Sequence, residues 1–290
     1  MVAPNAPVAV LFMTHFVSEP IIVEYRKLRR EVPSGHDVVL LYNTTERLPG
    51  VPPADTDVFR FDERSLRGLA YRRKSTRINS HNIDLFVLNF WRNRPQYEFY
   101  WVIEYDVRFS GDWRLVFEAF ADSAVDLLST TVYRYPFNPD WANWPTLKPP
   151  PGVELAAQDK IASFLPFYRI SNRGLTVVDQ GYRDGWAGHC ECTVPTLLAR
   201  NGLSIEDIGG DGEFVQPGNV NRFYRNTPKV RTHGPGTLVF RPIQRLVGDE
   251  PNQLWHPVKC AEGMATTRRQ RVWRRARILW RTGLEAVGLD

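Results

Sequence analysis

The sequence predicts an α/β fold with a mostly parallel central sheet, and three observations support this fold class. Short apolar runs of strand length alternate with amphipathic runs of helical length through the first half of the chain. Several short runs are apolar at nearly every position, which is typical of strands covered by helices on both faces. The 290 residues are enough for one large domain with a full hydrophobic core. A sheet of this kind binds ligands outside the carboxyl ends of its strands.

The first β-α unit opens the chain. Residues 8–16 form a continuous apolar run that predicts a buried strand, and residues 18–32 follow as a helix with a serine at its start and basic residues near its end. Residues 36–45 predict a second buried strand, and a proline-rich loop leads from it to a short strand over residues 57–61. The apolar spacing then predicts a helix over residues 76–93.

The next predicted strand lies near residues 99–105 and ends on two acidic residues. A capped amphipathic helix over residues 112–123 and a strand over residues 124–133 complete the α/β first half. Residues 133–152 form a loop rich in proline and aromatic residues, which indicates a lid or a wall of a binding site. In the second half we expect a helix near residues 190–200, ended by an Asn-Gly pair, and a short strand after it.

Composition and charge exclude several classes of protein. Hydrophobic residues make up 43% of the chain and charged residues 24%, as in globular proteins. No apolar run approaches the roughly 20 residues of a membrane span, and the N-terminus lacks the features of a signal peptide, so we expect a cytoplasmic protein. The three cysteines, Cys190, Cys192 and Cys260, indicate neither a disulfide framework nor a zinc site. The net charge of +5 is modest and locally concentrated, which argues against a nucleic-acid partner.

The last segment, residues 266–290, is predicted to form a basic amphipathic helix. Its tryptophan and isoleucine side chains lie among many arginines, a composition that suits peripheral contact with a membrane surface rich in anionic lipids. A solvated helix packed on its parent domain explains the same pattern. Residues 1–265 form the main predicted domain, and the loss of strand-helix alternation divides it into a first half, residues 1–132, and a second half, residues 133–265.

A pair of carboxylates suggests what the sheet binds. Glu104 and Asp106 end the strand near residues 99–105, where an α/β sheet places its ligand crevice. Side chains two residues apart lie on the same side of an extended backbone, so the two carboxylates converge. Such a pair suits Mg²⁺ or Mn²⁺, which bind through one or two carboxylates together with phosphates of a substrate. The alternative is an ordinary strand end whose acidic residues pair with nearby arginines.

The stretch YWVIEYDVRFSGDW, residues 100–113, resembles the metal-binding strand end of GT-A fold glycosyltransferases. In that family an Asp-x-Asp triplet, or a variant of it, holds the diphosphate of a nucleotide sugar through a divalent cation. Glu104, Tyr105 and Asp106 form the corresponding variant. Because Glu replaces the first Asp, the resemblance assigns direct ligation to Asp106 and leaves Glu104 to ribose or to the metal. It covers about residues 8–260 and implies a GT-A-like domain whose first half binds the nucleotide sugar and whose second half faces the acceptor.

Two further stretches resemble features of this family. GHCE resembles the acidic segment that supplies the catalytic base in inverting members, which makes Glu191 the candidate base and His189 the alternative, since imidazole titrates near neutral pH. A helix-start residue that favours the macrodipole is the competing explanation for Glu191. In LWHPVK, His256 matches a histidine that many members add as a metal or diphosphate ligand, and Lys259 is a candidate for the same diphosphate.

Other candidates come from cationic and polar residues. Arg72, Arg73 and Arg77 precede the carboxylate strand and are candidates for holding the diphosphate or the nucleotide; a solvated helix face is the alternative. His15, at the end of the first strand, is either close to the nucleotide or a strand-end core histidine. Asp211, in the glycine-rich stretch IGGDGEF, either contacts sugar hydroxyls or belongs to a surface turn.

The preferred interpretation is a metal-dependent glycosyltransferase that moves a sugar from a nucleotide diphosphate to an acceptor hydroxyl with inversion. The acceptor is a glycan, a lipid-linked molecule or a small molecule. A nucleotidyltransferase or a metal-dependent hydrolase uses the same kind of carboxylates and cation for other phosphate chemistry. A non-catalytic protein that binds nucleotides or anions is the third interpretation.

Overall fold

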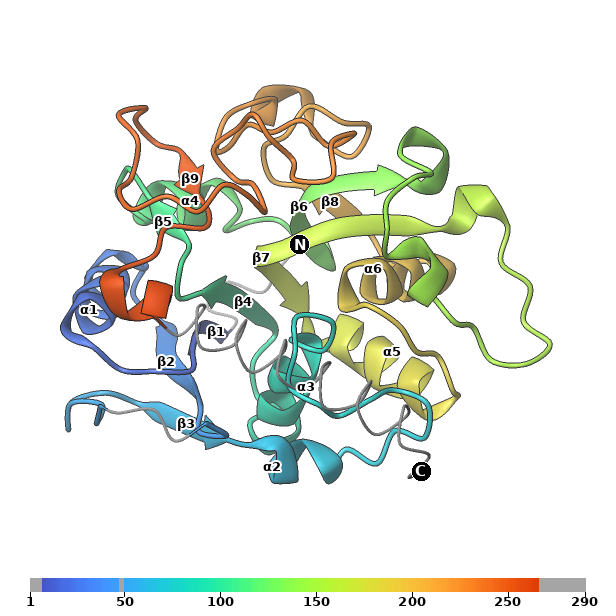
Figure 1. Ribbon diagram of the computed structural model, residues 1–290, viewed down its shortest axis with the longest axis horizontal. Coiled ribbons are helices and arrows are strands. Elements are labelled where there is room, and N and C mark those ends of the chain that lie inside the picture. The colour runs from blue at the N-terminus through green and yellow to red at the C-terminus, as the bar shows by residue number, and fades with distance from the viewer. Residues whose placement is uncertain (1–6, 47–49, 266–290) are drawn as a thin grey trace, which may run out of the picture.

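The protein is built on one seven-stranded sheet, seen in a computed structural model that describes residues 7–46 and 50–265 (Figure 1). The strand order is β3-β2-β1-β4-β7-β6-β8. The strands are β1 (Val8–Thr14), β2 (His36–Asn43), β3 (Val58–Phe61), β4 (Phe99–Glu104), β6 (Leu127–Arg134), β7 (Ile161–Ser171) and β8 (Ile205–Asp207). Six of them run in the same direction, and β7 alone is antiparallel to its two neighbours. The carboxyl ends of β1, β4, β6 and β8 therefore meet at one edge of the sheet.

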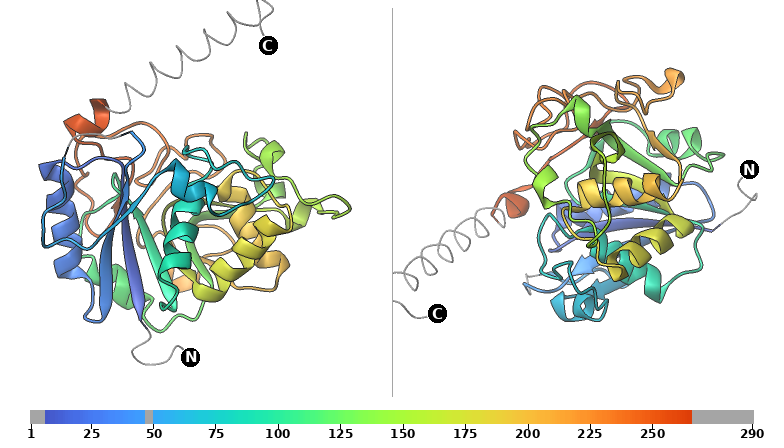
Figure 2. Two further views of the ribbon diagram at one scale, coloured as in Figure 1. Left: turned by 90° about the horizontal axis from the view of Figure 1, so that it is seen from below. Right: turned by 90° about the vertical axis from the view of Figure 1, so that its right-hand side faces the viewer.

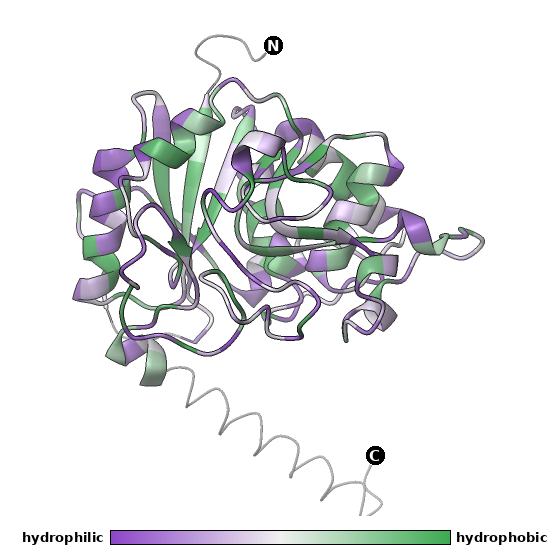
Figure 3. Ribbon diagram, turned by 90° about the horizontal axis from the view of Figure 1, so that it is seen from above, coloured by the Kyte–Doolittle hydropathy of each residue, from purple (hydrophilic) through white to green (hydrophobic). Residues whose placement is uncertain are grey.

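Helices cover both faces of the sheet, as Figure 2 shows. On one face lie α1 (Glu19–Glu31) and α4 (Arg114–Ala119), and on the other lie α2 (Glu63–Arg67), α3 (Asp84–Asn93), α5 (Asn172–Arg183) and α6 (Cys190–Arg200). Successive residues of β1 point to opposite faces, so Val10 packs with α1 while Leu11 packs with the α3 side. In Figure 3 the central strands are mostly hydrophobic, whereas the flanking helices alternate between hydrophobic and hydrophilic residues.

Most of the elements predicted in the first half are confirmed, and so is the coarse fold class of a mostly parallel sheet flanked by helices. The predicted strands and the helices α1, α4 and α6 appear with shifts of a few residues at their ends. The C-terminal helix predicted over residues 266–290 lies outside the described residues. Among the helices that the structure describes, none combines the length and apolar character needed to cross a bilayer.

The helix predicted over residues 76–93 is too long, because α3 begins only at Asp84. In the preceding segment, polar side chains bond to the local backbone and compete with helical hydrogen bonds. Asn79 Oδ1 accepts from the His81 N–H at 2.9 Å, and Asn82 Nδ2 donates to the Arg77 carbonyl at 2.8 Å. The segment folds as a series of turns instead.

The two longest elements without a counterpart among the sequence predictions are β7 and α5. Strand β7 is buried along all eleven residues, yet it contains Pro166 and Arg169, which interrupt the apolar run. The Arg169 guanidinium donates to the carbonyls of Phe120 and Ser123, at 3.0 and 2.7 Å, so tertiary contacts satisfy a charge that the local pattern marks as exposed.

A second, two-stranded sheet pairs β5 (Arg108–Phe109) with β9 (Leu254–Trp255). Arg108 faces Trp255 in this antiparallel pair. Although the two strands are far apart in sequence, their pairing brings the residues that follow β9 alongside the residues that follow β4. The candidate site forms at this junction.

Candidate metal centre

Three predicted residues converge where β4 ends and β9 ends. Glu104, Asp106 and His256 each offer one ligand atom, and these atoms all lie within 4.8 Å of one another. Glu104 is the last residue of β4, and Asp106 stands two positions further on. The Val258 N–H donates to the Asp106 carbonyl at 2.8 Å, which fixes the segment after β9 against the turn. The predicted metal ligands are therefore neighbours in space, from segments 150 residues apart.

The imidazole of His256 is oriented toward the two carboxylates. Its Nδ1 lies 2.7 Å from the Val239 carbonyl, which only accepts, so Nδ1 carries the proton and donates. Its Nε2 lies 3.7 Å from Glu104 Oε2 and 3.6 Å from Asp106 Oδ1. A histidine that donates its second nitrogen to a backbone carbonyl is the usual arrangement for a metal ligand, because that bond fixes the ring and its tautomer.

Asp106 is the most deeply buried acid of the group, with 2% of its surface exposed. Burial acts to raise the pKa of its carboxyl, but the charges of His256 and Lys259 outweigh burial and hold the pKa below its ordinary value. Within the described residues its Oδ1 has no hydrogen-bond partner. A buried carboxylate oxygen left without a donor indicates a missing cation or donor, and hard oxygen ligands of this kind fit Mg²⁺ or Mn²⁺.

Lys259 supplies a positive charge on the other side of Asp106. Its ammonium Nζ lies 3.0 Å from Asp106 Oδ2 and donates to the Tyr105 hydroxyl at 2.8 Å. Burial acts to lower the pKa of His256, yet the charges of Asp106 and Glu104 raise it. Two groups that can carry positive charge, the Lys259 ammonium and the His256 imidazole, thus lie beside the carboxylates.

His15 lies at the same edge of the sheet. Strands β1 and β4 pair in parallel, with Met13 opposite Glu104, so the residues after both strands are neighbours. The His15 ring packs edge-on against Tyr105, with centroids 5.1 Å apart. Burial lowers the pKa of His15 to about 4, helped by the charge of Lys259, so the imidazole is neutral at pH 7. The structure therefore places His15, at the end of β1, next to Tyr105, which lies between the two carboxylates in sequence.

His189 and Glu191 lie at the start of α6, and the structure separates their roles. The His189 Nδ1 accepts from the Glu191 backbone N–H at 3.2 Å and caps the helix. Burial lowers the pKa of His189 to about 3, aided by the charge of His81, whose ring lies 4.4 Å away. A neutral, buried cap with its Nδ1 already engaged is a poor general base, so the geometry favours Glu191.

The charge of Glu104 acts on the carboxyl of Glu191. The pKa of Glu191 is raised to about 8, first by burial and then by the charge of Glu104. A carboxyl that titrates near the working pH suits a group that takes a proton from a hydroxyl. The structure thus connects the second-half candidate base with the first-half carboxylates.

A buried ion pair holds the start of α6 in place. Lys74 Nζ lies 3.1 Å from Asp84 Oδ2 and donates to the Gly188 carbonyl at 3.0 Å. Both charged side chains are almost completely buried, with 1% and 6% exposed. This lysine had no assigned role in the sequence, because a charge within a basic run gives no local sign of burial.

The arginines of the same run are not brought to the carboxylates. Arg73 donates to the carbonyls of Pro149 and Gly185, at 2.8 and 2.9 Å, and so ties two loops together. Arg72 and Arg77 are exposed. Within the described chain, none of the three forms an ion pair with Glu104 or Asp106, whereas Lys259 does contact Asp106 at 3.0 Å.

We expect Lys259→Met to strengthen Mn²⁺ binding, because a metal at the carboxylates competes with the ammonium group for Asp106. Isothermal titration calorimetry should show a dissociation constant lower by on the order of tenfold, equivalent to about 1.4 kcal/mol. Lys148→Met, at an exposed position, is the control and should bind Mn²⁺ as the unmodified protein does. Equal or weaker binding by Lys259→Met would contradict a cation site at Asp106.

Glu191→Gln should reveal the raised pKa of the carboxyl through the pH dependence of stability. Folding raises this pKa from 4.5 to about 8, so the folded protein binds more protons over that interval and loses stability as the pH rises through it. In urea unfolding with EDTA, the variant should gain a few kcal/mol relative to the unmodified protein between about pH 5 and about pH 8. Glu118→Gln, an exposed position on α4, is the control. A difference that does not change with pH would show that Glu191 ionises freely.

Comparisons with known proteins assign no family to the chain: no family model matches it, and a search of curated proteins finds no significant match. The chemistry of the site therefore carries the functional argument.

Proposed function

We propose that the protein is a glycosyltransferase that transfers a sugar from a nucleotide-diphosphate sugar to an acceptor hydroxyl, with Mn²⁺ or Mg²⁺ held by Asp106, Glu104 and His256. One observation carries the proposal. Three ligand atoms converge within 4.8 Å at the carboxyl end of a strand, and the buried Oδ1 of Asp106 has no hydrogen-bond partner among the described residues. The mostly parallel sheet flanked by helices is compatible with the GT-A fold that the sequence resembles.

The leaving group in this reaction is a nucleoside diphosphate, whose negative charge grows as the sugar departs. A divalent cation at the three ligands supplies positive charge to that diphosphate. Lys259 can contribute a further charge, because its ammonium group reaches Asp106 and Tyr105 and a flexible stem lets it turn to a phosphate oxygen. His15, neutral and beside Tyr105, borders the same space at the end of β1.

The acceptor hydroxyl loses its proton as its oxygen attacks the anomeric carbon. Glu191 takes that proton, because a carboxyl whose pKa burial raises to about 8 holds a proton more strongly than an ordinary carboxylate and titrates near the working pH. A single base of this kind suits direct displacement, in which the bond to the diphosphate breaks as the bond to the acceptor oxygen forms and the anomeric configuration inverts. His189 supports the base by capping α6 at the Glu191 N–H.

The proposal predicts metal-dependent binding of one class of nucleotide. We would record thermal unfolding with UDP, GDP, CDP, dTDP and ADP, each with and without Mn²⁺. A ligand at 100 times its dissociation constant stabilises the folded state by about 2.7 kcal/mol. One nucleotide should raise the unfolding temperature only with Mn²⁺, and Asp106→Asn should abolish the shift. Asp122→Asn, an exposed aspartate after α4, should keep it.

The next assay uses a sugar nucleotide that carries the same base as the nucleotide that raised the unfolding temperature. Its products separate the enzyme classes. Release of the nucleoside diphosphate, with the sugar passing to water or an added glycoside, supports the transferase. Release of a sugar 1-phosphate instead, with the nucleoside monophosphate freed or passed to another group, indicates a hydrolase or nucleotidyltransferase, and no metal-dependent shift with any nucleotide contradicts the proposal.

A further inference from the structure

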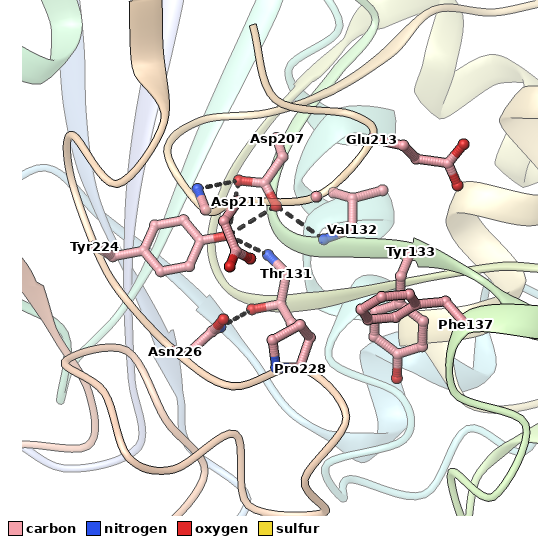
Figure 4. A pocket seen from close by; sticks show the side chains of 12 residues that line it. Thr131, Val132, Tyr133, Phe137, Asp207, Asp211, Glu213, Tyr224, Asn226 and Pro228 are labelled. Carbon is pink, nitrogen blue, oxygen red and sulfur yellow. Dashed lines mark hydrogen bonds between the residues drawn. The ribbon is translucent and has the colours of Figure 1, made fainter. Parts of the chain in front are cut away.

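A cavity of about 370 Å³ lies beyond the carboxyl ends of β6 and β8 (Figure 4). Its size falls within the roughly 300–1,000 Å³ of ligand pockets. It opens on the same sheet edge as the metal ligands, because β6 and β8 run parallel to β4. Its lining includes the side chains of Tyr133, Phe137, Asp211, Glu213 and Asn226.

One wall of the cavity is aromatic. The rings of Tyr133 and Phe137 have centroids 6.1 Å apart and planes inclined at 48°. Phe137 leaves 43% of its surface exposed, which is unusual for a large apolar side chain. The electron-rich faces of such rings attract the weakly positive C–H edges of a partner. A sugar ring offers C–H groups on its faces together with hydroxyls at its rim.

The opposite wall offers hydrogen-bond acceptors with little net charge. Asp211 and Glu213 contribute carboxylates, and Asn226 contributes an amide. Arg134 pairs with Glu213 at 3.3 Å, and the Lys229 ammonium lies 4.6 Å from the centre of the Phe137 ring. Asp207, the third acid that lines the cavity, is buried and accepts backbone N–H groups, so the more exposed carboxylates of Asp211 and Glu213 are matched by the two nearby cationic side chains. This balance suits a neutral ligand rich in hydroxyl donors.

The cavity is built on a rigid frame. The buried carboxylate of Asp207 accepts the N–H groups of Val132 and Gly210, at 2.9 and 3.0 Å, and the Tyr224 hydroxyl at 2.7 Å. A Cβ added to Gly210 would lie 2.5 Å from the Tyr224 hydroxyl, so this close approach requires glycine. Thr131 has the left-handed backbone angle φ +50°, and its N–H donates to the same Tyr224 hydroxyl. These bonds hold the walls in position before any ligand binds.

The inner wall of the cavity is linked through Trp141 to the start of α6. Tyr133 is buried, with its ring against Trp141 and Trp144 at centroid separations of 6.4 and 6.2 Å. Trp141 in turn contacts His189, the residue that caps α6 before Glu191. Burial raises the pKa of Tyr133, and the charge of Glu191 raises it further.

We propose that this cavity is a subsite for a neutral sugar residue of the acceptor, which stacks on the exposed ring of Phe137 beside Tyr133 and donates hydroxyl hydrogen bonds to Asp211 and Asn226. The inference rests on the proposed transferase function and names the substrate class of its second half. The sequence marked Asp211 as a candidate for sugar hydroxyls, and the structure places it at the wall of a formed cavity.

Saturation-transfer NMR on the full chain tests this subsite without catalysis. The probes are the methyl glycosides of glucose, galactose, mannose and N-acetylglucosamine, in the absence of nucleotide. At least one should receive saturation, and its signal should fall at least threefold in Phe137→Ala and in Asp211→Asn. Phe240→Ala removes a comparably exposed phenylalanine elsewhere and is the matched control, which should keep the signal.

The outcomes distinguish this subsite from the proposed function. No saturation of any glycoside, or signals unchanged in both cavity variants, overturns the subsite. So does an equal loss in Phe137→Ala and Phe240→Ala. Glycoside binding that depends on Phe137, together with no metal-dependent nucleotide binding, supports the sugar site and rejects the transferase. Nucleotide binding without glycoside binding leaves the transferase proposal in place and rejects the subsite alone.

Discussion

The buried carboxylate of Asp106 is the constraint on which the candidate site depends. A charge removed from water must be compensated, and breaking a buried ion pair by deleting one partner costs about 3–5 kcal/mol. Here the compensation comes from Lys259 and His256, which belong to a segment distant in sequence. That segment is held by the β5–β9 pair and by the bond from Val258 to the Asp106 carbonyl. The Asp106 carboxylate is therefore stable in its buried position only when the last described segment folds against it and brings these two cationic groups.

The sheet topology explains how a single edge collects groups of different chemistry. Parallel strands deliver His15 after β1 and the carboxylates after β4 to neighbouring positions. The reversed strand β7 lies between β4 and β6 and packs against α6, whose first turn carries Glu191. Beyond β7, the ends of β6 and β8 frame the aromatic cavity around Tyr133. The charged group around Asp106, the carboxyl of Glu191 and the aromatic cavity thus follow one another along this side of the sheet.

Local sequence patterns predicted the features that interactions between neighbouring residues in the sequence determine. Apolar runs located the first strands, and the strand-end position of Asp106 and its resemblance to a family motif indicated a cation site. The patterns could not predict that Lys74 is buried against Asp84 and shapes the segment before α3, since that pair forms through the tertiary fold. For the same reason, Arg73 was a candidate phosphate ligand in the sequence and binds loop carbonyls in the structure. His189 could not be separated from the base until its capping bond was seen.

Anomalous diffraction from crystals soaked in Mn²⁺ is the most direct test of a cation site at Asp106, because it locates the ion without reference to activity. We expect a single strong peak bounded by Asp106 Oδ1, a Glu104 oxygen and His256 Nε2. We also expect that the Lys259 ammonium has moved away from Asp106 as the ion arrives. A fully soaked crystal with no peak among these three side chains would contradict a cation site at Asp106. The carboxylate pair would then be a strand end balanced by its own lysine and histidine.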